Sequence, residues 1–218
     1  MLAGLVFASN AQADETQPSD INQRFMTSEP DALDFLESES REVFAQRAAI
    51  VDALKLSAGQ RVADVGAGTG AHLWELAKRV GPKGRVFAVD VAPKLVEHLR
   101  AQAQAKRLSQ VEVILAPQDD TGLPEASVDL VFTCDTYHHF EDPAAATRSI
   151  RRALVKGGRF VIVDFIRKES VSKSWVLEHV RAGKDVVVRE VEAAGFELVE
   201  EPTVAGLKDN YMLVFQAK

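Results

Sequence analysis

Residues 62–80, VADVGAGTGAHLWELAKRV, constrain the fold more than any other stretch of the sequence. A short apolar run is followed by three glycines at every second position. The apolar residues Leu73, Leu76, Ala77 and Val80 then recur at helical spacing. This pattern predicts a strand, a glycine turn and a helix. Glycine lets the backbone approach a bound group closely, so the turn is also a predicted ligand site.

Strand and helix patterns continue to alternate along the chain. We expect helices at residues 43–54, 73–80, 93–108, 143–155 and 174–194, the last with a break at Gly183. Between them we expect strands at residues 62–65, 86–89, 111–116, 127–135 and 159–165. The nearly continuous apolar run at 159–165 is typical of a parallel strand covered on both faces.

The end of the chain has a different pattern. Two strands, residues 196–201 and 211–218, are separated by too few residues for a parallel crossover, so they should run antiparallel. The predicted fold class is therefore α/β: a doubly wound, mostly parallel seven-stranded sheet with a C-terminal antiparallel hairpin.

Charge and cysteine content exclude several functions. The chain has 26 basic and 32 acidic residues, a net charge of -6, which argues against a nucleic-acid partner. No apolar run approaches the length of a membrane span. The single cysteine, Cys134, can form neither an internal disulfide nor a multi-thiolate metal site.

Acidic residues occupy the ends of the first four predicted strands. In an open α/β sheet the ligand lies beyond the carboxyl ends of the strands, where the strand order reverses. These positions hold Asp64, Asp90, Asp119 with Asp120, and Asp135. A carboxylate at Asp90 could accept both hydroxyls of a ribose, as an acidic residue does in nucleotide-binding folds.

Two kinds of cofactor fit the glycines. The residues Gly66-x-Gly68-x-x-Ala71 satisfy a dinucleotide fingerprint, which is weak evidence alone. Against it, Asp64 would repel a pyrophosphate but suits a cofactor that carries an ammonium and a sulfonium. Asp119 could accept from an adenine amino group, and a dinucleotide fold does not require the final hairpin. The carboxylates thus favour the sulfonium cofactor.

The successive motifs of class I S-adenosylmethionine-dependent methyltransferases resemble four stretches of this chain: VADVGAGTG, VFAVDVAP, QDDTGLPEASVDLVFTCDTYHHFEDP and RRALVKGGRFVIVDF. The resemblance covers about residues 40–218. It is greatest to the small-molecule branch that includes the ubiquinone and menaquinone methyltransferases. It implies transfer of a methyl group from S-adenosylmethionine to a small-molecule acceptor by in-line displacement.

The resemblance also implies residue roles around the methionine half of the cofactor. Gly66, Gly68 and Gly70 would line it, and Asp64 would help to hold its amino group. The segment Cys134-Asp135 would lie alongside. His72, in the first turn after the glycines, is expected either to contact the cofactor or to be exposed at the helix start.

A second set of implied roles concerns the adenosine half. Asp90 would bind the ribose hydroxyls, and Val91 would pack against adenine. Asp119 would accept from the adenine amino group, while the backbone at Asp120 approaches a ring nitrogen. Gln118 replaces the glycine that the family usually has before its aspartate, so Asp120 is the alternative adenine contact.

Two histidines, His138 and His139, follow the fourth strand near the expected position of the methyl group. Either could deprotonate an acceptor, because imidazole titrates near neutrality. The preferred alternative is that one packs under the next helix and the other shapes the pocket. No metal site is predicted, because this pair with Asp135 or Asp142 lacks a third clear ligand. His179 lies in a polar helical stretch and carries no signal.

Three successive segments are expected along the chain. Residues 1–20 are a lead-in in which Leu2–Ala8 and Ala11-Gln12-Ala13 resemble the core and cleavage site of a secretory signal, without its usual positive start. A frayed tail and a cytoplasmic location are the alternative to export. Residues 21–57 are expected to form a helical lid, or a plain surface helix, with Arg41 or Arg47 contacting an anionic acceptor. Residues 58–218 form the methyltransferase domain.

Two alternative functions stay open at this stage. The first is an NAD(P)-dependent oxidoreductase that uses the same glycine turn for a dinucleotide. The second is a noncatalytic protein that keeps the methyltransferase fold and binds the cofactor as a structural ligand.

Overall fold

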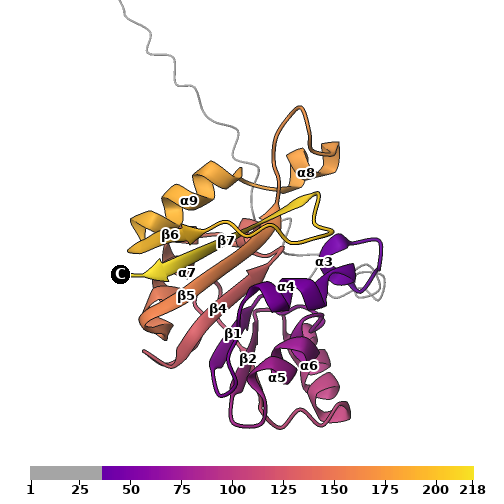
Figure 1. The fold of residues 1–218 in the computed structure, drawn as a ribbon, viewed down its shortest axis with the longest axis vertical. Helices are drawn as coiled ribbons and strands as arrows, with labels where there is room; N and C mark the ends of the chain where they lie inside the picture. The colour runs from indigo at the N-terminus through magenta and orange to yellow at the C-terminus, as the bar shows by residue number, and fades with distance from the viewer. Residues whose placement is uncertain (1–35) are drawn as a thin grey trace, which may run out of the picture.

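A single seven-stranded sheet runs through the computed structural model, which describes residues 36–218 (Figure 1). The strand order is β3-β2-β1-β4-β5-β7-β6. The strands are β1 (Arg61–Val65), β2 (Arg85–Asp90), β3 (Val111–Leu115), β4 (Val128–Cys134), β5 (Leu154–Phe165), β6 (Phe196–Glu200) and β7 (Asn210–Ala217). The first five strands pair in parallel, and β7 runs antiparallel to both of its neighbours. The predicted fold class and the C-terminal hairpin are confirmed.

Helices fill the connections between the strands. They are α3 (Glu42–Ala45), α4 (Arg47–Ala53), α5 (Leu73–Val80), α6 (Pro93–Ala105), α7 (Pro143–Ala153), α8 (Ser174–His179) and α9 (Lys184–Ala193), with a 3-10 turn η1 (Tyr137–His139) after β4. Proline opens both α6 and α7, where its fixed φ suits the first helical turn. Among residues 36–218 no helix is both long enough and apolar enough to span a membrane.

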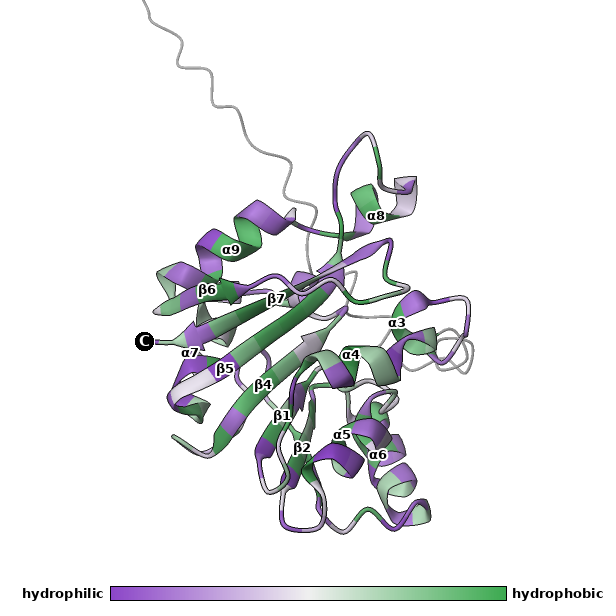
Figure 2. Ribbon diagram, viewed as in Figure 1, coloured by the Kyte–Doolittle hydropathy of each residue, from purple (hydrophilic) through white to green (hydrophobic). Residues whose placement is uncertain are grey.

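The core lies on both faces of the sheet. Along β5, Val161 and Val163 pack with α4 and α5, whereas Phe160 and Ile162 pack with α7 and α9. In Figure 1, α4 and α5 lie in front of the sheet and α7 passes behind it. Figure 2 shows the same division as continuous apolar strands under helices whose outer sides are polar. Burial on two faces explains why these strands lack an alternating pattern.

The segment predicted as a lid divides into two parts. Ile50, Val51 and Leu54 of the α4 region are fully buried in the core cluster that includes α5. This half therefore belongs to the main domain. The signal-like lead-in and the beginning of the predicted lid, residues 1–35, lie outside the described residues.

One predicted boundary was wrong. The helix expected to run to Val155 ends at Ala153, and β5 begins at once with Leu154. The glycines at 157 and 158 do not end the helix. They form a bulge within β5, where the register against β4 shifts and Gly157 adopts a φ of +73°. Glycine inside a strand commonly marks such a bulge.

Gly66, Gly68 and Gly70, which follow β1, all have positive φ, but the space beside each of them is occupied differently. A Cβ on Gly66 would overlap the side chain of Thr136, so the loop lies close to the segment after β4. A Cβ on Gly68 would meet nothing nearer than Leu36 Cδ1 at 3.9 Å. A Cβ on Gly70 would lie 3.0 Å from Leu99 Cδ2 of α6. Gly70 is thus needed for helix packing and Gly66 for the close approach to Thr136, and of the three only Gly68 faces the open side of the loop.

Replacing Gly70 with alanine should lower the free energy of unfolding by about 2–4 kcal/mol, because left-handed backbone strain and crowding against Leu99 add together. Gly157→Ala is the matched control, since its φ is also positive (+73°) but its Cβ would meet only Gln216 Nε2 at 3.7 Å. That variant should lose about 1–2 kcal/mol. Urea unfolding measures both values. An equal loss in the two variants would contradict the crowding at Gly70.

Candidate functional site

A cavity opens at the carboxyl ends of β1, β2 and β4, where the strand order reverses. It encloses about 1250 Å³ including its open mouth. The predicted site residues that line it are Asp64, Gly66, Gly68, Asp90, Val91, Asp119, Asp120, Cys134, Asp135 and His139. Gly70 and His138 lie outside this lining. The strand ends therefore meet at one site, as their positions in the sequence predicted.

Asp64 and Asp90 place two carboxyl groups in the buried floor of the cavity. Burial raises the pKa of Asp64 to about 7, and the nearby Asp90 charge adds to the effect. Asp64 Oδ2 is buried and has no hydrogen-bond partner among the described residues. An unpaired buried carboxylate oxygen is costly, which makes it a site for a cationic or hydrogen-bond-donating ligand.

Asp90 is held in place by backbone amides. Its Oδ2 accepts from the Gly68 amide at 2.8 Å, and its Oδ1 accepts from the Ala92 amide at 2.9 Å. Burial raises its pKa, and these two amides with that of Val91 oppose the change. The carboxylate is therefore fixed beside the glycine loop, at the end of β2.

Asp119 and Asp120 have different surroundings although they are neighbours. Asp120 accepts from the Gly122 amide at 2.8 Å and from Arg152 at 2.9 Å, and these contacts lower its pKa. Asp119 Oδ1 is buried and has no hydrogen-bond partner in the described part of the chain. Burial raises the pKa of Asp119, with the Asp142 and Glu141 amides opposing. Of the two, Asp119 is the side chain that offers an acceptor to the cavity.

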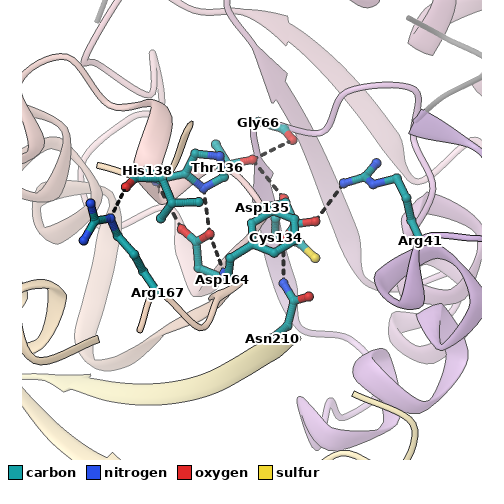
Figure 3. Close-up of polar contacts among 11 residues, drawn as sticks. Arg41, Gly66, Cys134, Asp135, Thr136, His138, Asp164, Arg167 and Asn210 are labelled. Carbon is teal, nitrogen blue, oxygen red and sulfur yellow. Dashed lines mark hydrogen bonds and ion pairs between the residues drawn. The ribbon is translucent and has the colours of Figure 1, made fainter. Parts of the chain in front are cut away.

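Asp135 lies between the two ends of the described chain (Figure 3). Its Oδ2 pairs with Arg41 at 2.7 Å, and its Oδ1 accepts from Asn210 Nδ2 at 2.6 Å. Burial raises its pKa to about 6, although Arg41 opposes that shift. Arg41 also donates to the Leu36 carbonyl at 3.0 Å. Arg41 thus fastens the segment before α3 across the cavity mouth. Arg47, the other predicted acceptor contact, donates to Glu39 and to the Phe44 carbonyl.

The histidines after β4 form part of a larger cluster. His138 is buried, and its Nδ1 lies 2.7 Å from Asp164 Oδ1. Burial lowers the pKa of His138, but the charge and hydrogen bond of Asp164 outweigh this and raise it. His139 borders the cavity, and burial with the neighbouring His138 and His179 lowers its pKa to about 2. The ring of His179, from α8, lies 5.1 Å from each of the other two rings. No local sequence pattern indicates that His179 belongs to this cluster, because His179 is far from His138 and His139 in the sequence and only the fold brings the three rings together.

Other cavity residues have simpler roles. Burial raises the pKa of the Cys134 thiol well above its usual range, which is typical of a neutral buried thiol and not of an activated nucleophile. His72 is buried in the cavity lining, so its predicted exposure was wrong. Burial lowers its pKa to about 4. Thr69 also lines the cavity and was not predicted.

Comparisons with known proteins identify the family of the chain. A family model described as a methyltransferase domain matches residues 56–216. The aklanonic acid methyltransferase DauC of Streptomyces sp. is 32% identical over 53% of this chain and 52% of its own length. The nocamycin O-methyltransferase of Saccharothrix syringae is 31% identical over 66% of this chain and 52% of its own. This chain thus spans about half the length of these curated relatives.

Solved structures share the fold. A SAM-dependent methyltransferase from Aquifex aeolicus superposes with a TM-score of 0.78 and 26% identity, covering 88% of this chain and all of the other. The chain belongs to the methyltransferase domain family, within the class I S-adenosylmethionine-dependent methyltransferase superfamily.

Proposed function

We propose that this protein transfers a methyl group from S-adenosylmethionine to a small-molecule acceptor by in-line displacement. The observation that carries the proposal is the buried Asp64 oxygen that has no hydrogen-bond partner among the described residues and belongs to the same cavity lining as the glycine loop. A pyrophosphate would be repelled there, whereas an ammonium would satisfy the carboxylate. Two relatives named for small molecules, an aklanonic acid methyltransferase and a nocamycin O-methyltransferase, support a small-molecule acceptor.

The residues present fit the cofactor along its whole length. Asp64 would hold the amino group, Gly68 would leave room for the methionine half, and the backbone of Gly66 would line it. Asp90 would accept from the ribose hydroxyls while it keeps its two backbone bonds. Asp119 Oδ1, also without a partner among the described residues, would accept from the adenine amino group. When bound, the sulfonium cofactor supplies an already activated methyl group.

With an activated donor, the main tasks of the protein are positioning and water exclusion. Leu36, Val43 and Phe44 border the cavity from the segment before β1. The Arg41–Asp135 ion pair ties this segment to the end of β4. We assign residues 36–44 as the part of the predicted lid that covers the cofactor and shapes the acceptor pocket.

His139 is the better placed of the two predicted base candidates. It borders the cavity, whereas His138 lies behind it with its Nδ1 bonded to Asp164. A pKa near 2 keeps the His139 imidazole neutral at physiological pH, but it also makes the ring too weak a base to take a proton from an acceptor hydroxyl near neutrality. The lowered pKa therefore favours the alternative role for His139, that of shaping the pocket.

Gly68→Arg should abolish binding of S-adenosylhomocysteine, because the new side chain would fill the open side of the loop. Gly59→Arg is the matched control: Gly59 also has positive φ, and a Cβ there meets nothing within 4 Å, but it lies outside the cavity lining. Calorimetric titration should give normal affinity for the control. Unchanged affinity in Gly68→Arg, or tight binding of NAD alone to the native protein, would contradict the proposal.

Removing the Asp119 side chain should weaken S-adenosylhomocysteine binding about 10- to 100-fold, the effect of losing one hydrogen bond to a charged group. Glycine is the replacement of choice, because Asp119 has a φ of +55°. Asp120→Ala should change the affinity only about twofold, because that carboxylate already bonds to Gly122 and Arg152. Calorimetry compares the two variants. A larger loss in the Asp120 variant would assign the adenine contact to Asp120.

Affinity for S-adenosylhomocysteine should rise as pH increases from about 5.5 to 8. The pKa of Asp64 is raised to about 7 in the free protein, so at lower pH a proton must leave before the carboxylate can pair with an ammonium. The limiting slope is about tenfold per pH unit. Asp90 is the charge that faces Asp64 most strongly, and Asp135 also titrates near pH 6. Asp64→Asn should therefore bind more weakly and lose most of the slope. A slope equal to that of the native protein would assign the effect to another group.

A further inference from the structure

Three of the five histidines in the chain converge beside the cofactor cavity. One ring nitrogen from each of His138, His139 and His179 lies within 4.8 Å of the other two. Tetrahedral zinc with bonds of about 2.0–2.1 Å holds its nitrogens about 3.3 Å apart. Side-chain rotations could close this gap, since the three ring centroids already lie 4.1–5.1 Å apart.

Asp164 fixes the orientation of the His138 ring. It accepts from the His138 ring Nδ1 at 2.7 Å and from the Phe165 and His138 amides at 2.8 and 3.1 Å. The backbone bonds fix the carboxylate, which then fixes the ring with its Nε2 pointing away (Figure 3). Histidine ligands of metals usually donate their other nitrogen to such a carboxylate.

The second ring nitrogen of His138 has no partner in the described part of the chain. Nε2 of His138 is buried and has no hydrogen-bond partner among residues 36–218. The His138 side chain is only 3% exposed, so bulk water does not replace the missing partner. An unpaired imidazole nitrogen at this depth costs free energy unless a bound group satisfies it.

Local charge favours a cation at the cluster. The two nearby arginines are already neutralised: Arg41 pairs with Asp135 at 2.7 Å, and Arg181 pairs with Glu190 at 2.8 Å. The ion pairs in the described part of the chain give Asp164 no lysine or arginine partner. Its direct ion-pair partner there is His138, and the Arg181 charge also interacts with it.

Aromatic side chains enclose the cluster on the side of α8. Phe165 lies 5.8 Å from the His138 ring, and Trp175 lies 6.3 Å from the His179 ring. The two aromatic rings meet edge to face at 5.1 Å. Such an apolar surround limits solvent access to a metal and strengthens its bonds.

We propose that His138, His139 and His179 bind one divalent transition metal ion, of which Zn²⁺ is the best match to three imidazoles. Three protein ligands leave a fourth position open, as in catalytic zinc sites. Because His139 borders the cavity, that position is accessible to an oxygen or sulfur donor of a small molecule there. The assignment of that donor to the methyl acceptor rests on the proposed function, whereas metal binding does not.

Titration of untagged, chelator-treated full-length protein with Zn²⁺ tests the site. We expect one equivalent to bind with micromolar affinity or better, and Co²⁺ to give the visible absorption of a tetrahedral complex. His179→Ala should weaken binding at least 100-fold and abolish the cobalt spectrum. His179 is half-buried on a short helix, so this variant should fold. Asp164→Asn should weaken binding about 10- to 100-fold.

His98→Ala is the matched control, because His98 is partly buried on α6 and lies outside the cluster. It should bind Zn²⁺ like the native protein. S-adenosylhomocysteine affinity, measured on the same variants, should be unchanged by His179→Ala, which separates failure of the metal site from failure of the cofactor site. Absence of stoichiometric binding, or equal affinity in the His98 and His179 variants, would overturn the proposal.

Discussion

The central position of β1 determines where everything else can lie. β1 pairs in parallel with β2 on one side and β4 on the other, so Asp64 stands beside Ala88 and Phe132. The chain first moves outward to β3 and then returns to β4. The helices that follow β1 and β4 consequently cover opposite faces, and a crevice opens between the two strand ends. The cavity is a consequence of strand order before any side chain is considered.

The strand ends at this crevice carry three buried carboxyl groups, those of Asp64, Asp90 and Asp135. Each of the three has different hydrogen-bond partners. Asp90 is held by two backbone amides, and Asp135 by Arg41 and Asn210. Asp64 Oδ2 has no such partner in the described chain. Proteins seldom leave a buried polar atom unsatisfied except where a ligand completes it. This difference among three otherwise similar residues is the reason for proposing that Asp64 receives the ammonium group of the cofactor.

Much of this could be predicted from sequence. Parallel strands buried on two faces produce apolar runs, and a short linker forces the final antiparallel pair, so the sheet was predictable. The glycines were harder to interpret from sequence. Gly157 lies in a bulge of β5, although a glycine at that place resembles a helix end. Gly70 makes room for Leu99, although it resembles a ligand-binding glycine. His179 could not be predicted as a partner of His138, since only tertiary packing brings them together. Strand ends are set locally, whereas the partners of buried charges are set by the whole fold.

The antiparallel hairpin also contributes to the site, because of its direction. β7 runs against β5, so its first residue, Asn210, pairs with Phe165 at the end of that strand. A parallel seventh strand would place its first residue at the opposite edge of the sheet. Antiparallel pairing instead brings Asn210 to Asp135, which Arg41 reaches from the segment before β1. Asp164, near the end of β5, orients His138 at the same edge. Segments before the first strand and in the last strand thus fix one residue between the cofactor cavity and the histidine cluster, which couples the order of both regions to completion of the sheet.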